Sequence, residues 1–98
     1  MLKKKYSKKD NSCDVTFILS PGVDAKSAFL CGDFNNWDKT ATKMDFSEKE
    51  GFSVTLKLKI GTSYRFRYYL DDERWENDWQ SDSYYPNEFG SEDSVVEL

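Results

Sequence analysis

The chain has 98 residues, a length typical of a single domain. Its 14 basic and 18 acidic side chains give a formal net charge of -4, so there is no basic excess for binding nucleic acid. Histidine is absent, which excludes Ser-His-Asp and Cys-His catalysis and disfavours a zinc site; we expect no metal and no cofactor. No window approaches the ~18 apolar residues of a membrane span, so neither nucleic acid nor a membrane is expected as a partner.

The cysteine content indicates the compartment. Cys13 and Cys31 are too few for a disulfide framework, so we expect free thiols and a cytoplasmic location. The basic start of the chain lacks the apolar stretch of a signal peptide.

The first part of the chain changes from a polar composition to an alternation of apolar and polar side chains. Residues 1–12, rich in Lys, Ser and Asn, are expected to form a flexible basic tail before one domain at residues 13–98. Residues 15–19 have the period of a strand, and the breakers at residues 20–22 end it. Residues 28–31 follow as a second strand, and we expect the two strands to pair as a hairpin.

The remaining strands are predicted from the same alternation. Residues 52–59 form a clear half-buried strand, with a short strand expected before it at residues 43–46. Residues 64–70 alternate as well, and residues 94–98 close the chain as a last strand. The polar stretch 76–92 has no period and is expected to be a surface loop. The side chains expected to point outward from residues 64–70 are Arg65, Arg67 and Tyr69.

Short alternating strands with frequent turn signals, and no stretch of helical spacing, predict an all-β sandwich of about seven antiparallel strands. The aromatic content is high for a core of this size, with six Tyr, seven Phe and three Trp. Some rings therefore face solvent or a ligand. If rings such as Phe29 and Tyr69 are exposed, self-association is one alternative.

Residues 32–38 (GDFNNWD) combine a glycine, two aromatic side chains and two asparagines directly after a predicted strand. The glycine ends the strand or allows a close backbone approach, and the asparagines favour a turn. Trp37 then lies at a loop edge, where it either covers the core or offers an exposed apolar plate.

Four further features of the chain are short motifs: residues 32–38, 64–72 (YRFRYYLDD), 75–78 (WEND), and 87–90 (NEFG) with 93–96 (DSVV). In this order and spacing, the four segments resemble the family 48 carbohydrate-binding module. This is the domain before the catalytic barrel of isoamylases and glycogen branching enzymes, and the glycogen-binding domain of the AMP-activated protein kinase β subunit. The resemblance implies an immunoglobulin-like early-set β-sandwich.

The resemblance also implies a site in which α-glucan lies across one face. Trp37 and Trp75 match the family's two tryptophans. Phe89 stands in place of a leucine and Ser91 in place of a threonine. Arg67 replaces a lysine, and Asp93 replaces an asparagine, so Asp93 accepts hydrogen bonds but does not donate them.

The expected carbohydrate contacts are Asn35, Asn36, Trp37, Arg67, Trp75, Phe89, Ser91 and Asp93. Sugar rings present apolar C–H faces and a rim of hydroxyls, which suit aromatic plates with polar groups at their edges. Each of the main residues also has a purely structural alternative. Trp75 would cover the edge of the sandwich, and Arg67 would pair with a neighbouring carboxylate.

We therefore expect a non-catalytic module for α-1,4/α-1,6-glucan (glycogen, starch or maltooligosaccharide), with a glucan-metabolising enzyme as a further partner. The acidic residues of the stretch 71–78, including Asp78, are expected in a solvated turn and not in an active site. The alternative is a protein-interaction or regulatory early-set domain that has lost sugar binding.

Overall fold

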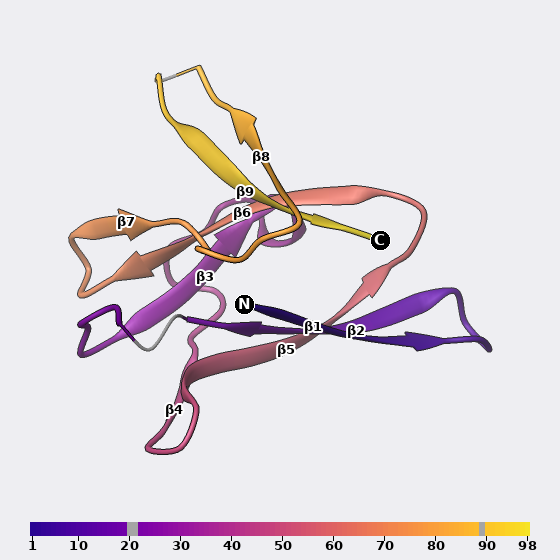
Figure 1. Cartoon of the computed structure of the whole chain (residues 1–98), viewed down its shortest axis with the longest axis horizontal. Coiled ribbons are helices and arrows are strands. Elements are labelled where there is room, and N and C mark those ends of the chain that lie inside the picture. Colours follow the sequence, from indigo (N-terminus) through magenta and orange to yellow (C-terminus); the bar gives the residue numbers. More distant parts are fainter. Residues whose placement is uncertain (20–21, 89) are drawn as a thin grey trace.

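Two antiparallel sheets face each other in the computed structural model of the chain (Figure 1). The structure describes residues 1–19, 22–88 and 90–98, and these residues contain nine strands. The predicted all-β sandwich is confirmed, with two more strands than expected. Within the same residues, no helix has the length and apolarity that a membrane span requires.

The first sheet has four strands in the order β1-β2-β5-β4. Each neighbouring pair in this sheet is antiparallel. In spatial order the strands are β1 (Leu2–Ser7), β2 (Ser12–Ile18), β5 (Gly51–Lys59) and β4 (Asp45–Ser47).

The second sheet is built around β6, which pairs with three other strands. One edge of β6 pairs with β3. The other edge pairs with β9 along the first half of β6 and with β7 along its second half. Phe66 is opposite both Gly32 of β3 and Ser94 of β9, so these two strands lie on opposite edges of β6. The strands are β3 (Ala28–Gly32), β6 (Ser63–Leu70), β7 (Arg74–Glu76), β8 (Ser83–Pro86) and β9 (Glu92–Glu97), with a 3-10 turn, η1 (Asp33–Asn35), after β3.

Inward-facing apolar side chains of both sheets fill the space between them. Phe17 of β2 packs edge-on against Phe66 of β6, with ring centroids 5.0 Å apart and planes at 73°. Tyr68 and Leu70 continue the buried set on β6, as the alternation predicted. The intervening residues of β6 therefore point away from the core.

The expectation of a flexible tail at residues 1–12 is wrong for Leu2–Ser7, which form β1 and pair with β2 along their whole length. The sequence pattern did not predict this strand, because a lysine takes one of its inward positions. Lys4 is half-buried, and its Nζ lies 2.6 Å from Asp82 Oδ2 and donates to Glu97 O at 3.0 Å. The neighbouring lysines are exposed, which is usual for an edge strand.

The predicted hairpin between residues 15–19 and 28–31 is also wrong. β2 pairs with β1 and β5, whereas β3 pairs with β6 in the facing sheet. A strand, a turn and a second strand have the same sequence pattern whether the chain returns in one sheet or crosses to the other. Cys13 and Cys31 are both buried free thiols, as expected.

The stretch 76–92 is not one continuous loop, because Ser83–Pro86 form β8 and pair with β9. β8 is short, lies at the edge of the sheet and ends in a proline, so it lacks the alternation of an internal strand. The 43–46 strand is displaced, as β4 at Asp45–Ser47, with a single bridge between Lys43 and Phe29 before it.

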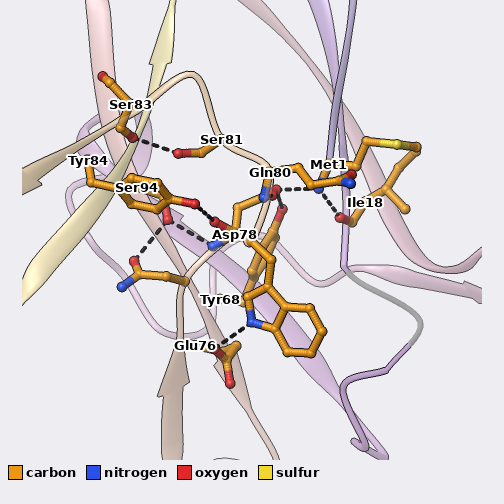
Figure 2. A network of polar contacts seen from close by, with 12 residues as sticks. Met1, Ile18, Tyr68, Glu76, Asp78, Gln80, Ser81, Ser83, Tyr84 and Ser94 are labelled. Atoms are coloured by element: carbon orange, nitrogen blue, oxygen red, sulfur yellow. Dashed lines mark hydrogen bonds and ion pairs between the residues drawn. The ribbon is translucent and has the colours of Figure 1, made fainter.

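Asp78 is buried, contrary to the expectation of a solvated turn. Its Oδ2 accepts a hydrogen bond from Tyr68 Oη at 2.7 Å and lies 2.6 Å from the Met1 amine, which itself donates to Ile18 O (Figure 2). Its Oδ1 accepts from Gln80 N, and its backbone N donates to Ser94 Oγ. The carboxylate thus joins β6 to the end of β2 across the two sheets.

Candidate functional site

An open groove of about 780 Å³ lies on the outer face of the second sheet. It is formed where η1 and its following loop, β6, β7 and the β8–β9 connection meet. Its lining consists of Asp33, Trp37, Arg65, Arg67, Trp75, Pro86, Asn87, Glu88, Ser91 and Asp93.

Gly32 determines how closely the Trp37 loop approaches β6. A Cβ atom at this position would lie 2.5 Å from the carbonyl oxygen of Arg65 and 2.8 Å from the ring of Phe34. Its backbone is extended (φ -177°), so the glycine is needed for space and not for an unusual dihedral angle. Both roles that the sequence predicted for this glycine are observed, since Gly32 is the last residue of β3 and also allows the close backbone approach.

The two asparagines shape the turn. Asn35 Nδ2 donates to Leu30 O at 2.9 Å and to Thr42 Oγ1 at 3.0 Å, while its Oδ1 accepts from Gly32 N. Asn36 has the left-handed backbone that asparagine tolerates well (φ 58°). Both side chains lie outside the groove lining.

Trp37 is held at the groove by Asp33. Its backbone has a positive φ of 58°, uncommon for a bulky residue, and its Nε1 donates to Asp33 Oδ1 at 3.0 Å. The other oxygen, Oδ2, accepts from Arg65 N on β6 at 2.9 Å. One carboxylate therefore fixes the indole to the neighbouring strand.

Trp75 reaches the same groove from β7. It is opposite Tyr69 in the β6–β7 pairing, and their ring centroids are 4.7 Å apart. The Trp37 and Trp75 centroids are 6.4 Å apart with an interplanar angle of 62°. Trp75 is 38% exposed and Trp37 is half-buried, so both rings keep solvent-facing surface. We call these two side chains the tryptophan platform.

Two further side chains support the platform. Lys39 Nζ lies 5.0 Å from the centroid of Tyr69 and 5.6 Å from that of Trp75, within cation–π range. Tyr69 Oη donates to Asp72 O at 2.7 Å. Tyr69 is thus packed beneath Trp75 and is not the freely exposed ring that self-association would use.

Arg67 adopts the structural alternative that the sequence allowed. Its Nε lies 3.2 Å from Asp93 Oδ1, and its guanidinium also donates to Ser91 Oγ and Glu92 O. Asp93 is only 8% exposed and also accepts a hydrogen bond from Asn87 Nδ2 at 3.2 Å. Arg67 and Asp93 therefore bind each other at the groove wall.

Five of the eight residues predicted to bind carbohydrate line one groove: Trp37, Arg67, Trp75, Ser91 and Asp93. Asn35 and Asn36 do not, and Phe89 lies outside the described residues. The sequence analysis did not select Arg65 and Asp33 as site residues. Arg65 shares the outward face of its strand with Arg67, and that alternation was the signal available for finding it.

The Cys31 thiol lies beneath the same loop and donates to Asp38 O. Burial raises the pKa of Cys31 to about 11, so the thiol stays protonated at neutral pH. Hydrogen bonds from the backbone N and the hydroxyl of Thr40 lower the pKa of Asp38. Cys31 is therefore not an activated nucleophile.

Residues 7–97 match the family model described as the glycogen recognition site of AMP-activated protein kinase. The chain belongs to this family. The match spans the groove and every strand except most of β1, and it confirms the family that the four motifs indicated. A comparison with curated proteins found no match. The chain is thus a member of a carbohydrate-binding family, with its tryptophan platform inside the matched region.

Proposed function

We propose that this domain binds α-1,4/α-1,6-glucan, such as glycogen, starch or a maltooligosaccharide, on the tryptophan platform and without catalysis. The observation that carries the proposal is the convergence of Trp37 and Trp75, 6.4 Å apart and both partly exposed, in one open groove. Membership of the glycogen-recognition family supports the choice of ligand.

The platform has the chemistry that a glucan needs. Indole rings offer flat apolar surface to the C–H faces of sugars, and their two torsion angles cost little entropy on binding. Polar groups of Arg67, Ser91 and Asp93 lie at the groove wall, next to where sugar hydroxyls would lie. A shallow site of this kind is expected to bind in the micromolar to millimolar range, on the order of -4 to -8 kcal/mol.

The acidic groups of the groove support a non-catalytic role. Glycoside hydrolysis uses two carboxylates, one as acid and the other as base or nucleophile. Both oxygens of Asp33 accept hydrogen bonds from the protein, and Asp93 is paired with Arg67. Among the described groove residues, this leaves Glu88 as the one acid without a protein partner.

Isothermal titration with maltoheptaose and with β-cyclodextrin tests the proposal. Wild type should release heat with both sugars, and the Trp37→Ala, Trp75→Ala double variant should bind at least about tenfold more weakly. Trp79→Ala is the matched control, since Trp79 is a 55% exposed tryptophan outside the groove lining. Absence of heat from wild type at millimolar sugar would refute the proposal.

One observation favours the alternative of a protein-interaction or regulatory domain. The Arg67–Asp93 ion pair occupies polar groups that a sugar-binding groove would otherwise direct at hydroxyls. If amylose resin retains neither wild type nor the Arg67→Lys, Asp93→Asn double variant, this alternative is favoured.

For the proposed glucan-binding role, a glucan-metabolising enzyme is the partner that the family resemblance supports, and the two free thiols support a cytoplasmic location.

A further inference from the structure

The groove contains two arginines from the same strand, and their surroundings differ. Arg67 donates to Ser91 and Glu92 and pairs with Asp93. The guanidinium of Arg65 instead lies over an aromatic ring, with its central carbon 3.8 Å from the centroid of Tyr85. Among the described residues, no acceptor binds the side-chain N–H groups of Arg65. The arginine with donors available for a ligand is therefore Arg65.

Tyr85, the ring that contacts this arginine, belongs to β8. It is opposite Asp93 in the β8–β9 pairing and is 51% exposed. Stacking on the ring holds the guanidinium plane in place while leaving the N–H groups at its edge free to donate. The Arg65–Tyr85 pair thus offers the two components of a sugar site: fixed hydrogen-bond donors and an exposed aromatic surface.

The pair lies beyond the tryptophan platform on the same outer face. Arg65 lines the groove and also a second depression of about 570 Å³, which Tyr85, Ser63 and Val95 line as well. Along β6, Arg65 is four residues from Tyr69, the ring beneath Trp75, a separation of about 13 Å at the usual rise of a strand. A sugar ring at the Trp75 end of the platform does not reach Arg65, whereas a longer chain that continues past Trp37, which Asp33 links to the Arg65 backbone, does.

We propose that the Arg65–Tyr85 pair is a second glucan subsite, which binds additional glucose units of chains long enough to extend from the tryptophan platform. This inference rests on the proposed glucan-binding function and adds a preference for longer chains. Arg65 donates hydrogen bonds to sugar hydroxyls, and the exposed part of the Tyr85 ring packs against the sugar.

Titration of wild type and variants with maltotriose and with maltoheptaose tests the second subsite. Tyr85→Ala should weaken maltoheptaose binding about fivefold while changing maltotriose binding by less than about twofold, and Arg65→Gln should also weaken maltoheptaose binding about fivefold. Tyr85→Phe keeps the ring and should retain the heptaose affinity. Tyr6→Ala is the matched control, because Tyr6 is 53% exposed on β1 of the other sheet.

NMR spectroscopy reports directly on whether Arg65 contacts the sugar. In a heteronuclear NMR spectrum, the Nε–H signal of Arg65 should shift on addition of maltoheptaose and stay in place with maltotriose. A shift with neither sugar, an unchanged heptaose affinity in Tyr85→Ala, or equal losses for the two sugars in that variant would each overturn the inference. If wild type binds neither sugar, the proposed function fails and the subsite fails with it. If wild type binds both and Tyr85→Ala behaves like wild type, only the subsite fails.

Discussion

Asp33 shows how one short side chain positions a much larger one. Its two oxygens accept from the Trp37 indole and from the backbone N of Arg65, so it connects the loop after η1 to β6. The same contacts connect the tryptophan platform to the strand that carries Arg65. Asp33 acts as a positioning residue, because its effect on a ligand is exerted through Trp37.

We predict that Asp33→Ala weakens maltoheptaose binding about tenfold, because the freed indole must be ordered on binding. Asp33→Asn should have an intermediate effect, since its amide keeps one acceptor but places a donor against an N–H group. Calorimetric titration gives the affinities, and the tryptophan fluorescence of the free protein reports the indole's environment. Asp45→Ala on the other sheet is the control. An unchanged affinity in Asp33→Ala would contradict the positioning role.

At this scale the sequence predicted which large side chains line the groove better than it predicted the roles of the small ones. Trp37 and Trp75 lie in one groove because motif and strand order place them there. Asn35 was expected at the sugar, yet its amide is used within the turn. The role of Asp33 depends on β6 passing within hydrogen-bond distance of η1, and no local pattern encodes that approach.

Among the strands, the internal ones were predictable and so was β3 at an edge, whereas the edge strands β1 and β8 were not. β5 and β6 alternate clearly because one face of each is buried. β1 has Lys4 at an inward position, and β8 is four residues long and ends in Pro86, so neither has a period to detect. Polar residues, prolines and short length are also features that protect edge strands from pairing with other chains.

The β6–β7 hairpin that carries Trp75 is anchored by an acidic residue. Asp71 Oδ1 accepts hydrogen bonds from Lys26 N at 2.7 Å and from Ser27 N at 3.0 Å. These backbone hydrogen bonds lower the pKa of Asp71 below its ordinary value. The folded state therefore favours the ionised form, and the contribution to stability is full above the unfolded pKa of about 3.9.

Acidification should accordingly destabilise the domain in part through this turn. As the pH falls from about 5 toward the lowered pKa of folded Asp71, the unfolded state takes up protons first and this contribution is lost. We predict that the urea midpoint of wild type falls more steeply with acid than that of Asp71→Asn, which has no proton to bind there. Identical slopes for wild type and Asp71→Asn would show that Asp71 makes no such contribution.

The crossing of the chain between sheets is the feature of the whole molecule that the sequence could not predict. β2 and β3 belong to different sheets. The β7–β8 connection places the buried carboxylate of Asp78 against the Met1 amine, beside the first sheet. Asp78 resembles its acidic neighbours in sequence, and only the fold distinguishes it. Burial of Tyr68 raises the pKa of its phenol, and the neighbouring Asp78 carboxylate raises it further, because ionisation would place a second negative charge beside the first.

We predict that Asp78→Ala lowers the free energy of unfolding by about 3 kcal/mol, because it leaves the buried Tyr68 hydroxyl and the Gln80 N–H without their acceptor. Tyr68→Phe removes one hydrogen bond and should cost about 1 kcal/mol. Asp82→Ala is an informative comparison, since the Lys4–Asp82 ion pair also joins the two sheets but is about a quarter exposed, and it should cost about 1 kcal/mol. Urea unfolding of the three variants measures these differences. If Asp78→Ala costs no more than Asp82→Ala, burial of the carboxylate is not what makes this link between the sheets strong.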